Sequence, residues 1–118
     1  HALRAAEDPE RLVCVFQPHQ HSRTRFLLDQ FAESFSAADE VIVPEIYFVR
    51  DSEAEKKKVN ATDLVDRLQM RGVSARHMAD FSDIVATLRA DLRAGDLLVV
   101  MGAGPVWTIG RDFMGTNV

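Results

Sequence analysis

The sequence predicts a single α/β domain with a mainly parallel sheet. Short apolar runs alternate along the chain with longer amphipathic stretches, which is the pattern of strands and helices in βα units. Runs 11–17 and 96–101 are apolar almost throughout, as expected for strands that helices cover on both faces. The length of 118 residues suits one domain, and no internal repeat, low-complexity segment or linker divides it. We therefore expect residues 1–118 to form one folded unit.

The first half of the chain is predicted to contain two strands with a helix between them. The first strand is 11–17, and a helix over 23–36 follows, with Ser22 at its N-cap. Three large apolar residues recur on this helix at helical spacing: Leu27, Phe31 and Phe35. Residues 40–46 form the second predicted strand, in which Pro44 lacks an amide donor and favours an early end or a bulge over a central position.

Two further helices are predicted in the second half of the chain. Asn60 or Thr62 is expected to cap the first, which ends at Gly72. Ser82 is expected to cap the second, which ends at Gly95. The residues expected to be buried on these helices are Leu64, Val65, Leu68, Ile84, Val85, Leu88 and Leu92.

The remaining segments complete the predicted order of elements. Strands are expected at 73–78 and 96–101, and Pro105 suits the first turn of a closing helix. Residues 1–8 are expected to be the end of a helix. The charged run 50–58 has no apolar periodicity and is expected to be a solvated loop or a frayed helix.

The composition excludes several classes of function. The net charge of −4 argues against a general nucleic-acid or anionic-membrane binder. No apolar run approaches the roughly 20 residues that cross a bilayer, and no signal-peptide pattern is present. The single cysteine, Cys14, lies in an apolar run and is expected to be a buried, unreactive thiol in a cytoplasmic protein. The first residue is His1 instead of Met, which suggests a domain excised from a longer protein.

Segment 17–25, between the first strand and its helix, is a candidate anion site. It holds two histidines and two arginines without one acid, in a chain that is acidic overall. Unpaired amides and the helix dipole make the start of a helix electropositive, so arginine is unfavourable there unless an anion binds. The alternative is that Arg23 and Arg25 point into water and that His19 and His21 only fill a loop.

The turn after the last strand is a second candidate. Gly102, Ala103 and Gly104 would let the backbone approach a ligand or a neighbouring domain closely. A dinucleotide-binding motif is excluded, because Trp107 stands in place of the third glycine and too little chain follows for the ribose-binding acid. The alternative is a tight turn between a strand and a helix.

Other catalytic and metal-binding motifs are absent from the sequence. Without a phosphate-binding loop, the chain is not expected to hydrolyse ATP unaided. No cysteine pair or HExxH motif supplies a zinc site, and no carboxylate lies close in sequence to His19 and His21, so we expect no metal site. No serine has a nucleophile elbow. His77 is expected to be structural, and no catalytic residue is predicted.

Two motifs stand close together at the candidate anion site: FQPH at 16–19 and SRT at 22–24. In this order they resemble the hallmark of the C-terminal domain of the Mur ligases, specifically of members that add L-alanine to UDP-N-acetylmuramate. Three more segments resemble that domain in the same order: LRAA at 3–6, PEIY at 44–47 and DLLVVMGAG at 96–104. The resemblance covers essentially the whole chain.

The resemblance implies a Rossmann-like, three-layer domain, the last of three in an ATP-dependent ligase of peptidoglycan precursor synthesis. The N-terminal domain would hold the UDP-sugar, and the central one would contain the phosphate loop and magnesium sites; neither belongs to this chain. ATP would phosphorylate the muramate carboxylate, and the amine of L-alanine would attack the acyl phosphate. The chain alone is expected to be inactive and to bind neither ATP nor Mg.

The resemblance also assigns roles to individual residues. Arg23 would bind the alanine carboxylate or neighbouring substrate oxygens, and His19 would line the same site. The other positions assigned to substrate binding are Ser22, Thr24, Gly102, Ala103 and Gly104. The chain departs from the family at Gln20-His21, where many relatives have Arg-Tyr, and at Pro105, where many have Asp or Asn.

These departures leave the amino-acid specificity open, so that sister ligases adding other amino acids stay possible. Outside the family, the alternative is a stand-alone α/β module that binds a small molecule or signals. A phospho-receiver domain would need acids after the first strand, where Gln17-Pro18-His19 offers none.

Overall fold

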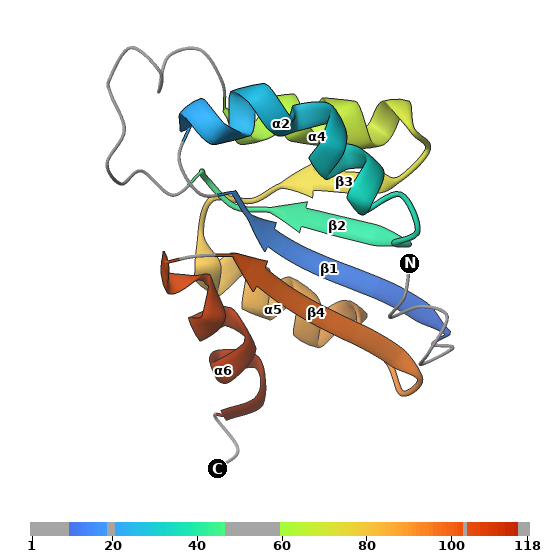
Figure 1. Cartoon of the computed structure of the whole chain (residues 1–118). Coiled ribbons are helices and arrows are strands. Elements are labelled where there is room, and N and C mark those ends of the chain that lie inside the picture. Colours follow the sequence, from blue (N-terminus) through green and yellow to red (C-terminus); the bar gives the residue numbers. More distant parts are fainter. Residues whose placement is uncertain (1–9, 19–20, 47–59, 103, 116–118) are drawn as a thin grey trace.

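The computed structural model shows a three-layer α/β domain (Figure 1). The structure describes residues 10–18, 21–46, 60–102 and 104–115. A four-stranded sheet forms the middle layer, with α2 and α4 over one face and α5 and α6 over the other. The predicted fold class is therefore confirmed. The predictions for 1–8 and 50–58 lie outside the described residues, and none of the described helices is long and apolar enough to span a bilayer.

All four predicted strands are present, and they run parallel in the order β3-β2-β1-β4. Their bounds are Arg11–Gln17 for β1, Glu40–Val43 for β2, Ser74–His77 for β3 and Asp96–Gly102 for β4. The pairing of β1 with β4 extends over both strands, from Arg11 opposite Asp96 to Gln17 opposite Gly102. The carboxyl ends of the two longest strands therefore lie side by side.

Strand β2 shows how the chain accommodates Pro44. The strand ends at Val43, so the predicted early end is confirmed. The expectation against a central position is wrong, because β2 lies between β1 and β3. Since Pro44 follows the last strand residue, its missing amide removes no bond from the ladder. Val43 still accepts a hydrogen bond from the Met78 amide at 3.1 Å.

The described helices are α2 (His21–Ser34), α4 (Ala61–Met70), α5 (Phe81–Asp91) and α6 (Trp107–Gly115), the last preceded by a 3-10 turn at Gly104–Val106. Asn60 caps α4 as predicted, in a capping box whose other half is the Asp63 carboxylate accepting from the Asn60 amide at 2.8 Å. Gly72, at φ +82°, follows α4.

Two predicted N-caps are wrong. Asp80 caps α5, since its carboxylate accepts from the Ser82 amide at 2.8 Å, and Ser82 lies inside the helix. Aspartate and serine are comparable N-caps, so the sequence pattern could not choose between positions two residues apart. Helix α2 begins at His21, which places Ser22 within the helix instead of before it.

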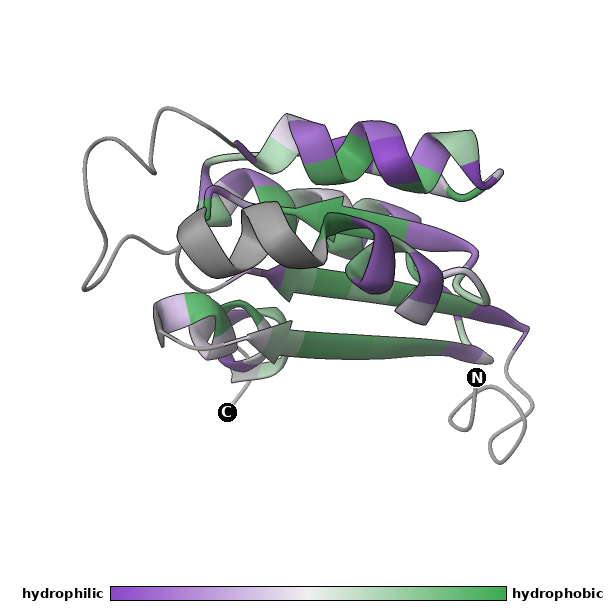
Figure 2. Cartoon of the chain, turned by 45° about the horizontal axis from the view of Figure 1, so that its top comes forward, coloured by the Kyte–Doolittle hydropathy of each residue, from purple (hydrophilic) through white to green (hydrophobic). Residues whose placement is uncertain are grey.

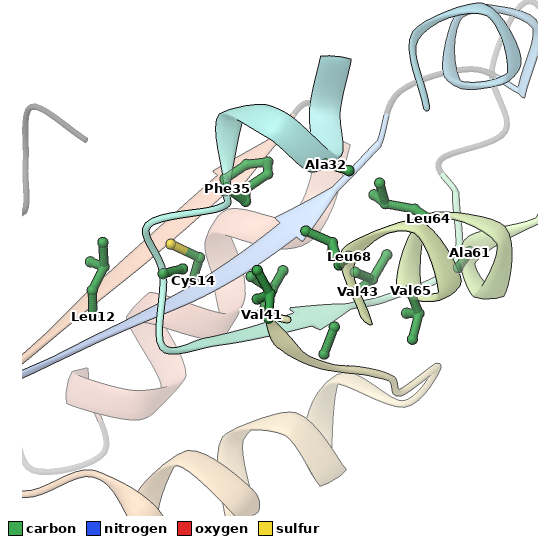
Figure 3. Packing of buried hydrophobic residues seen from close by; sticks show 13 residues of the cluster. Leu12, Cys14, Ala32, Phe35, Val41, Val43, Ala61, Leu64, Val65 and Leu68 are labelled. Atoms are coloured by element: carbon green, nitrogen blue, oxygen red, sulfur yellow. The ribbon is translucent and has the colours of Figure 1, made fainter. Parts of the chain in front are cut away.

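The two faces of the sheet bury separate apolar clusters. Side chains alternate along β1, so that Leu12 and Cys14 pack toward α2 and α4, whereas Val13 and Val15 pack toward α5 and α6. Figure 3 shows the first cluster, in which Phe35, directly after α2, joins residues of α4, β1 and β2. The second cluster includes Ile84, Leu88, Val106 and Ile109. Each face thus has its own core, as a parallel sheet requires.

Ion pairs join the amino ends of β1, β2 and β4, and the side chain of Arg76, the third residue of β3, also reaches them. Arg11 lies 3.0 Å from Asp96 and 4.0 Å from Glu40, and Arg76 lies 2.7 Å from Glu40 and 3.3 Å from Asp91. Figure 2 shows the apolar strands β1 and β4 ending in hydrophilic residues here. The amide of Arg93 and then the guanidinium of Arg11 hold the pKa of Asp96 below its usual value. We call this end of the sheet the amino edge and the opposite end the carboxyl edge.

Candidate functional site

The carboxyl edge contains a close backbone approach between β1 and β4. Gly102 has φ +138°, and a Cβ atom there would lie 2.5 Å from the Gln17 carbonyl oxygen. Real side chains do not tolerate that distance, so the position requires glycine. This close approach is to the neighbouring strand β1, so the predicted approach to a ligand or a neighbouring domain stays a prediction. The substrate-binding roles predicted for Gly102 and Gly104 stay predictions, and Ala103 lies outside the described residues.

The start of α2 lies at this same edge. In Figure 1 the blue end of the helix lies on the side of the strand arrowheads. Ser22, Arg23 and Thr24 belong to its first turn, while their side chains, and His19 entirely, lie outside the described residues. The first turns of α2 and α6 contain no acid, whereas those of α4 and α5 contain Asp63 and Asp83. Nothing in the first turn of α2 offsets the positive end of the helix dipole, so this turn favours an anion.

A polar cluster that the sequence does not predict lies beside this helix start. Gln17, at the end of β1, is only 5% exposed, and its Nε2 donates to the Glu45 carbonyl oxygen at 3.0 Å. His77, at the end of β3, places Nε2 at 2.7 Å from Glu45 Oε1. Glu45 follows β2, so the cluster joins the ends of three neighbouring strands. We call Gln17, Glu45 and His77 the Glu45 cluster.

The Glu45 cluster is incompletely hydrogen-bonded. Within the described part of the chain, no group donates to the buried Gln17 Oε1. His77 Nε2 is also buried and unsatisfied, because its short contact with Glu45 is not aligned for a hydrogen bond. A buried polar atom without a partner costs about 1–3 kcal/mol, which applies to Gln17 Oε1, whereas His77 Nε2 still has the Glu45 carboxylate 2.7 Å away.

The cluster could be found only through the strand order. Gln17 and Glu45 are 28 residues apart, and the sequence contains no local pattern that joins them. Glu45 belongs to the PEIY segment, and His77 is predicted only to be structural. The parallel order β3-β2-β1 brings the three residues to one edge. A donor on a ligand could bind to such acceptors, which complements the anion-binding start of α2.

An exposed apolar surface adjoins the same edge. Trp107 begins α6 and is largely exposed, with the Arg111 guanidinium 5.1 Å from the ring centroid. Met101 and Met114 are also exposed, on β4 and α6. Stacking of a guanidinium on indole is favourable at exposed sites but modest. Singly exposed apolar residues are common, so these three side chains do not define a binding site by themselves.

The described residues show no metal cluster and no reactive thiol. No group of three or more His, Cys, Asp or Glu among them could hold an ion. Cys14 is buried, as predicted, and burial raises the pKa of its thiol to about 11. The thiol is therefore neutral near pH 7 and a poor nucleophile or ligand.

Comparison with known proteins shows the family. Residues 1–104 match the family described as "Mur ligase, glutamate ligase domain". The UDP-N-acetylmuramate–L-alanine ligase of Clostridium novyi (strain NT) is 43% identical over 96% of this chain and 25% of its own length. The enzyme of the same name from Caldanaerobacter subterraneus is 41% identical over 92% of this chain and 23% of its own length. The chain thus spans about a quarter of these relatives.

Solved structures share the fold. The UDP-N-acetylmuramate-alanine ligase of Thermotoga maritima superposes with a TM-score of 0.68 at 22% identity, over 97% of this chain and 22% of that chain. A crystallised domain of a Haemophilus ducreyi protein superposes with a TM-score of 0.65 at 18% identity, over 99% of this chain and 76% of that chain. At these identities the likeness concerns the fold alone.

Proposed function

The chain belongs to the Mur ligase family, and we propose that it is the amino-acid-binding C-terminal domain of an ATP-dependent ligase that joins L-alanine to UDP-N-acetylmuramate. The shared name of relatives 41–43% identical to this chain supports the reaction. The observation that supports the site is the start of α2, where a turn containing Arg23 and no acid lies at the carboxyl edge of the sheet. Ligands of open α/β sheets bind at this edge.

The proposed reaction divides its chemistry among domains. The carboxylate of UDP-N-acetylmuramate is phosphorylated by ATP, and the amine of L-alanine then displaces phosphate from the acyl phosphate to form the amide. A phosphate loop and magnesium sites belong, in this proposal, to a central domain, and the UDP-sugar site to an N-terminal one. This chain supplies position and charge, and its closure over the other domains brings the amine to the acyl carbon.

Arg23 has the leading role in the proposed site. Its guanidinium binds the alanine carboxylate through paired hydrogen bonds, and the amides of the first turn add the field of the helix end. Ser22, Thr24 and His19 line the same pocket, and the turn 102–104 closes it from the side of β4. We also propose a cytoplasmic location, where ATP is available and the lone thiol of Cys14 stays reduced.

Substitution of Arg23 by alanine in the full-length ligase tests this assignment. Hydrogen bonds to charged groups contribute about 1.5–3 kcal/mol, so the KM for L-alanine should rise about tenfold or more while the KM for ATP stays unchanged. The matched control is Arg67→Ala, since Arg67 is an exposed arginine on α4 that pairs with Asp29 at 2.9 Å. Wild-type kinetics in Arg23→Ala would remove Arg23 from the site.

The same assay tests the substrate. L-alanine, glycine and L-serine are compared as acceptors, because the chain has Gln20-His21 where many relatives have Arg-Tyr. We expect the highest kcat/KM with L-alanine. A full-length protein that forms ADP with none of these amino acids in the presence of UDP-N-acetylmuramate would contradict the proposed reaction.

A further inference from the structure

The two buried side-chain atoms that lack hydrogen-bond partners among the described residues are Gln17 Oε1 and His77 Nε2. They come from β1 and β3, the two strands that flank β2, and both residues contact Glu45 just beyond the end of β2. Hydrogen bonds of binding sites are often incomplete in the free protein and form fully only in the complex. The unsatisfied atoms therefore point to Glu45 as part of a binding site.

Glu45 itself is fixed by its backbone and open at its side chain. Its carbonyl oxygen accepts from Gln17 Nε2 at 3.0 Å, and this bond also orients the Gln17 amide, because a carbonyl can pair only with the NH₂ group. The Glu45 side chain is 61% exposed, whereas the His77 side chain beside it is 25% exposed. The carboxylate is thus accessible to a ligand, while Gln17 bonds the Glu45 backbone and His77 contacts one carboxylate oxygen.

The charges at the carboxyl edge are divided between two neighbouring strands. Beyond β1, the start of α2 favours an anion, and beyond β2, Glu45 offers a carboxylate. Strands β1 and β2 are neighbours, about 4.8 Å apart, so the residues that follow them leave the sheet at the same edge. An α-amino acid has an ammonium group and a carboxylate on one carbon, and it matches this division.

We propose that Glu45 binds the ammonium group of the incoming amino acid, with Gln17 and His77 as the residues that position it. The inference rests on the proposed function and adds to it the second half of the amino-acid site. The carboxylate of the amino acid is held at α2, and its nitrogen at Glu45. Two contacts on either side of the α-carbon fix the direction in which the nitrogen faces the acyl group.

Glu45→Gln in the full-length ligase tests the subsite, because it removes the charge and keeps the shape of an exposed side chain. The KM for L-alanine should rise about tenfold or more, as expected for the loss of a charge-assisted contact, while the KM for ATP and for UDP-N-acetylmuramate stay unchanged. The matched control is Glu33→Gln, the same change on an exposed residue in the last turn of α2, at the amino edge. Glu45→Asp should recover part of the loss.

Propionate tests binding of the carboxylate separately from binding of the ammonium group, because it resembles alanine but lacks the amine. Its inhibition constant against alanine should be unchanged in Glu45→Gln and raised in Arg23→Ala. An unchanged KM for alanine in Glu45→Gln overturns the ammonium subsite, and so does a KM for ATP that rises equally. Failure of the proposed function looks different, since the wild-type ligase itself would then form no product with L-alanine.

Discussion

Replacement of Gly102 by alanine should destabilise the domain severely, and its magnitude can be worked from the structure. The residue has φ +138°, a conformation that costs a non-glycine residue about 1–3 kcal/mol. The new Cβ would lie 2.5 Å from the Gln17 carbonyl oxygen and 3.2 Å from Val106 Cγ1. Relief of such overpacking costs about 1–3 kcal/mol more, since the close neighbour is backbone of a paired strand. The expected loss is therefore about 2–6 kcal/mol.

Substitutions at two other glycines distinguish the cost of backbone strain from the cost of steric crowding. Gly72 has φ +82° with nothing within 4 Å of its added Cβ, so Gly72→Ala should cost only the strain, about 1–2 kcal/mol. Gly110 lies in α6, where its added Cβ would make an ordinary contact with Val100 Cγ2 at 3.8 Å. Gly110→Ala should stabilise by about 0.5–1 kcal/mol, because alanine is the better helix former.

Urea titration of the three variants, followed by far-UV circular dichroism, measures these differences. From the highest unfolding free energy to the lowest, the expected order is Gly110→Ala, wild type, Gly72→Ala and Gly102→Ala. A Gly102→Ala variant no less stable than Gly72→Ala would refute the reasoning, because crowding against β1 would then contribute nothing. In that case the backbone of Gly102 and Gln17 would have to move apart at no cost in free energy.

Two further predictions concern the cap of α4 and the buried thiol. Asn60→Ala should lower the unfolding free energy by about 1 kcal/mol in urea titration, because the Asp63 amide loses its side-chain acceptor, whereas Asn60→Asp should stay near wild type. Cys14, whose pKa burial raises to about 11 from 9.0, should react with a disulfide reagent at pH 8 only after denaturation, and fast reaction of the native chain would contradict its burial. The folded state keeps the Cys14 proton up to a higher pH than the unfolded state does, so the unfolding free energy should fall as the pH rises from about 9 to 11. Cys14→Ala should lack this contribution to the pH dependence of stability.

The sequence predicts well the features that depend on neighbouring residues. Strand β1 has the predicted bounds, and Asn60 caps α4, because periodicity and capping are local patterns. The N-cap of α5 is missed, because Asp80 and Ser82 are comparable candidates two residues apart. The predicted early end of β2 near Pro44 is correct. The expectation that β2 would not be a central strand is wrong, because its pairing stops at Val43, one residue before the proline.

The sequence predicts the anion-binding half of the candidate site but not the Glu45 cluster. The segment 17–25 shows its unusual charge within nine residues, and the structure places the start of α2 at the carboxyl edge. The Glu45 cluster depends on which strands are neighbours, and apolar periodicity does not reveal strand order. Glu45 and His77 are single polar residues near strand ends, and either is unremarkable until β2 and β3 lie beside β1.

The contrast between the two edges of the sheet supports a site at the carboxyl edge. At the amino edge, Arg11 and Arg76 each contact two carboxylate-bearing residues, and the Asp96 carboxylate also accepts from the Arg93 amide at 3.0 Å. At the carboxyl edge, buried Gln17 Oε1 and His77 Nε2 have no hydrogen-bond partner among the described residues, and the Glu45 carboxylate beside them is accessible. In the part of the chain that the structure describes, the polar groups at the amino edge have partners, whereas two polar atoms at the carboxyl edge lack hydrogen bonds. Since unsatisfied burial costs stability, the Glu45 cluster supports the binding site proposed at this edge.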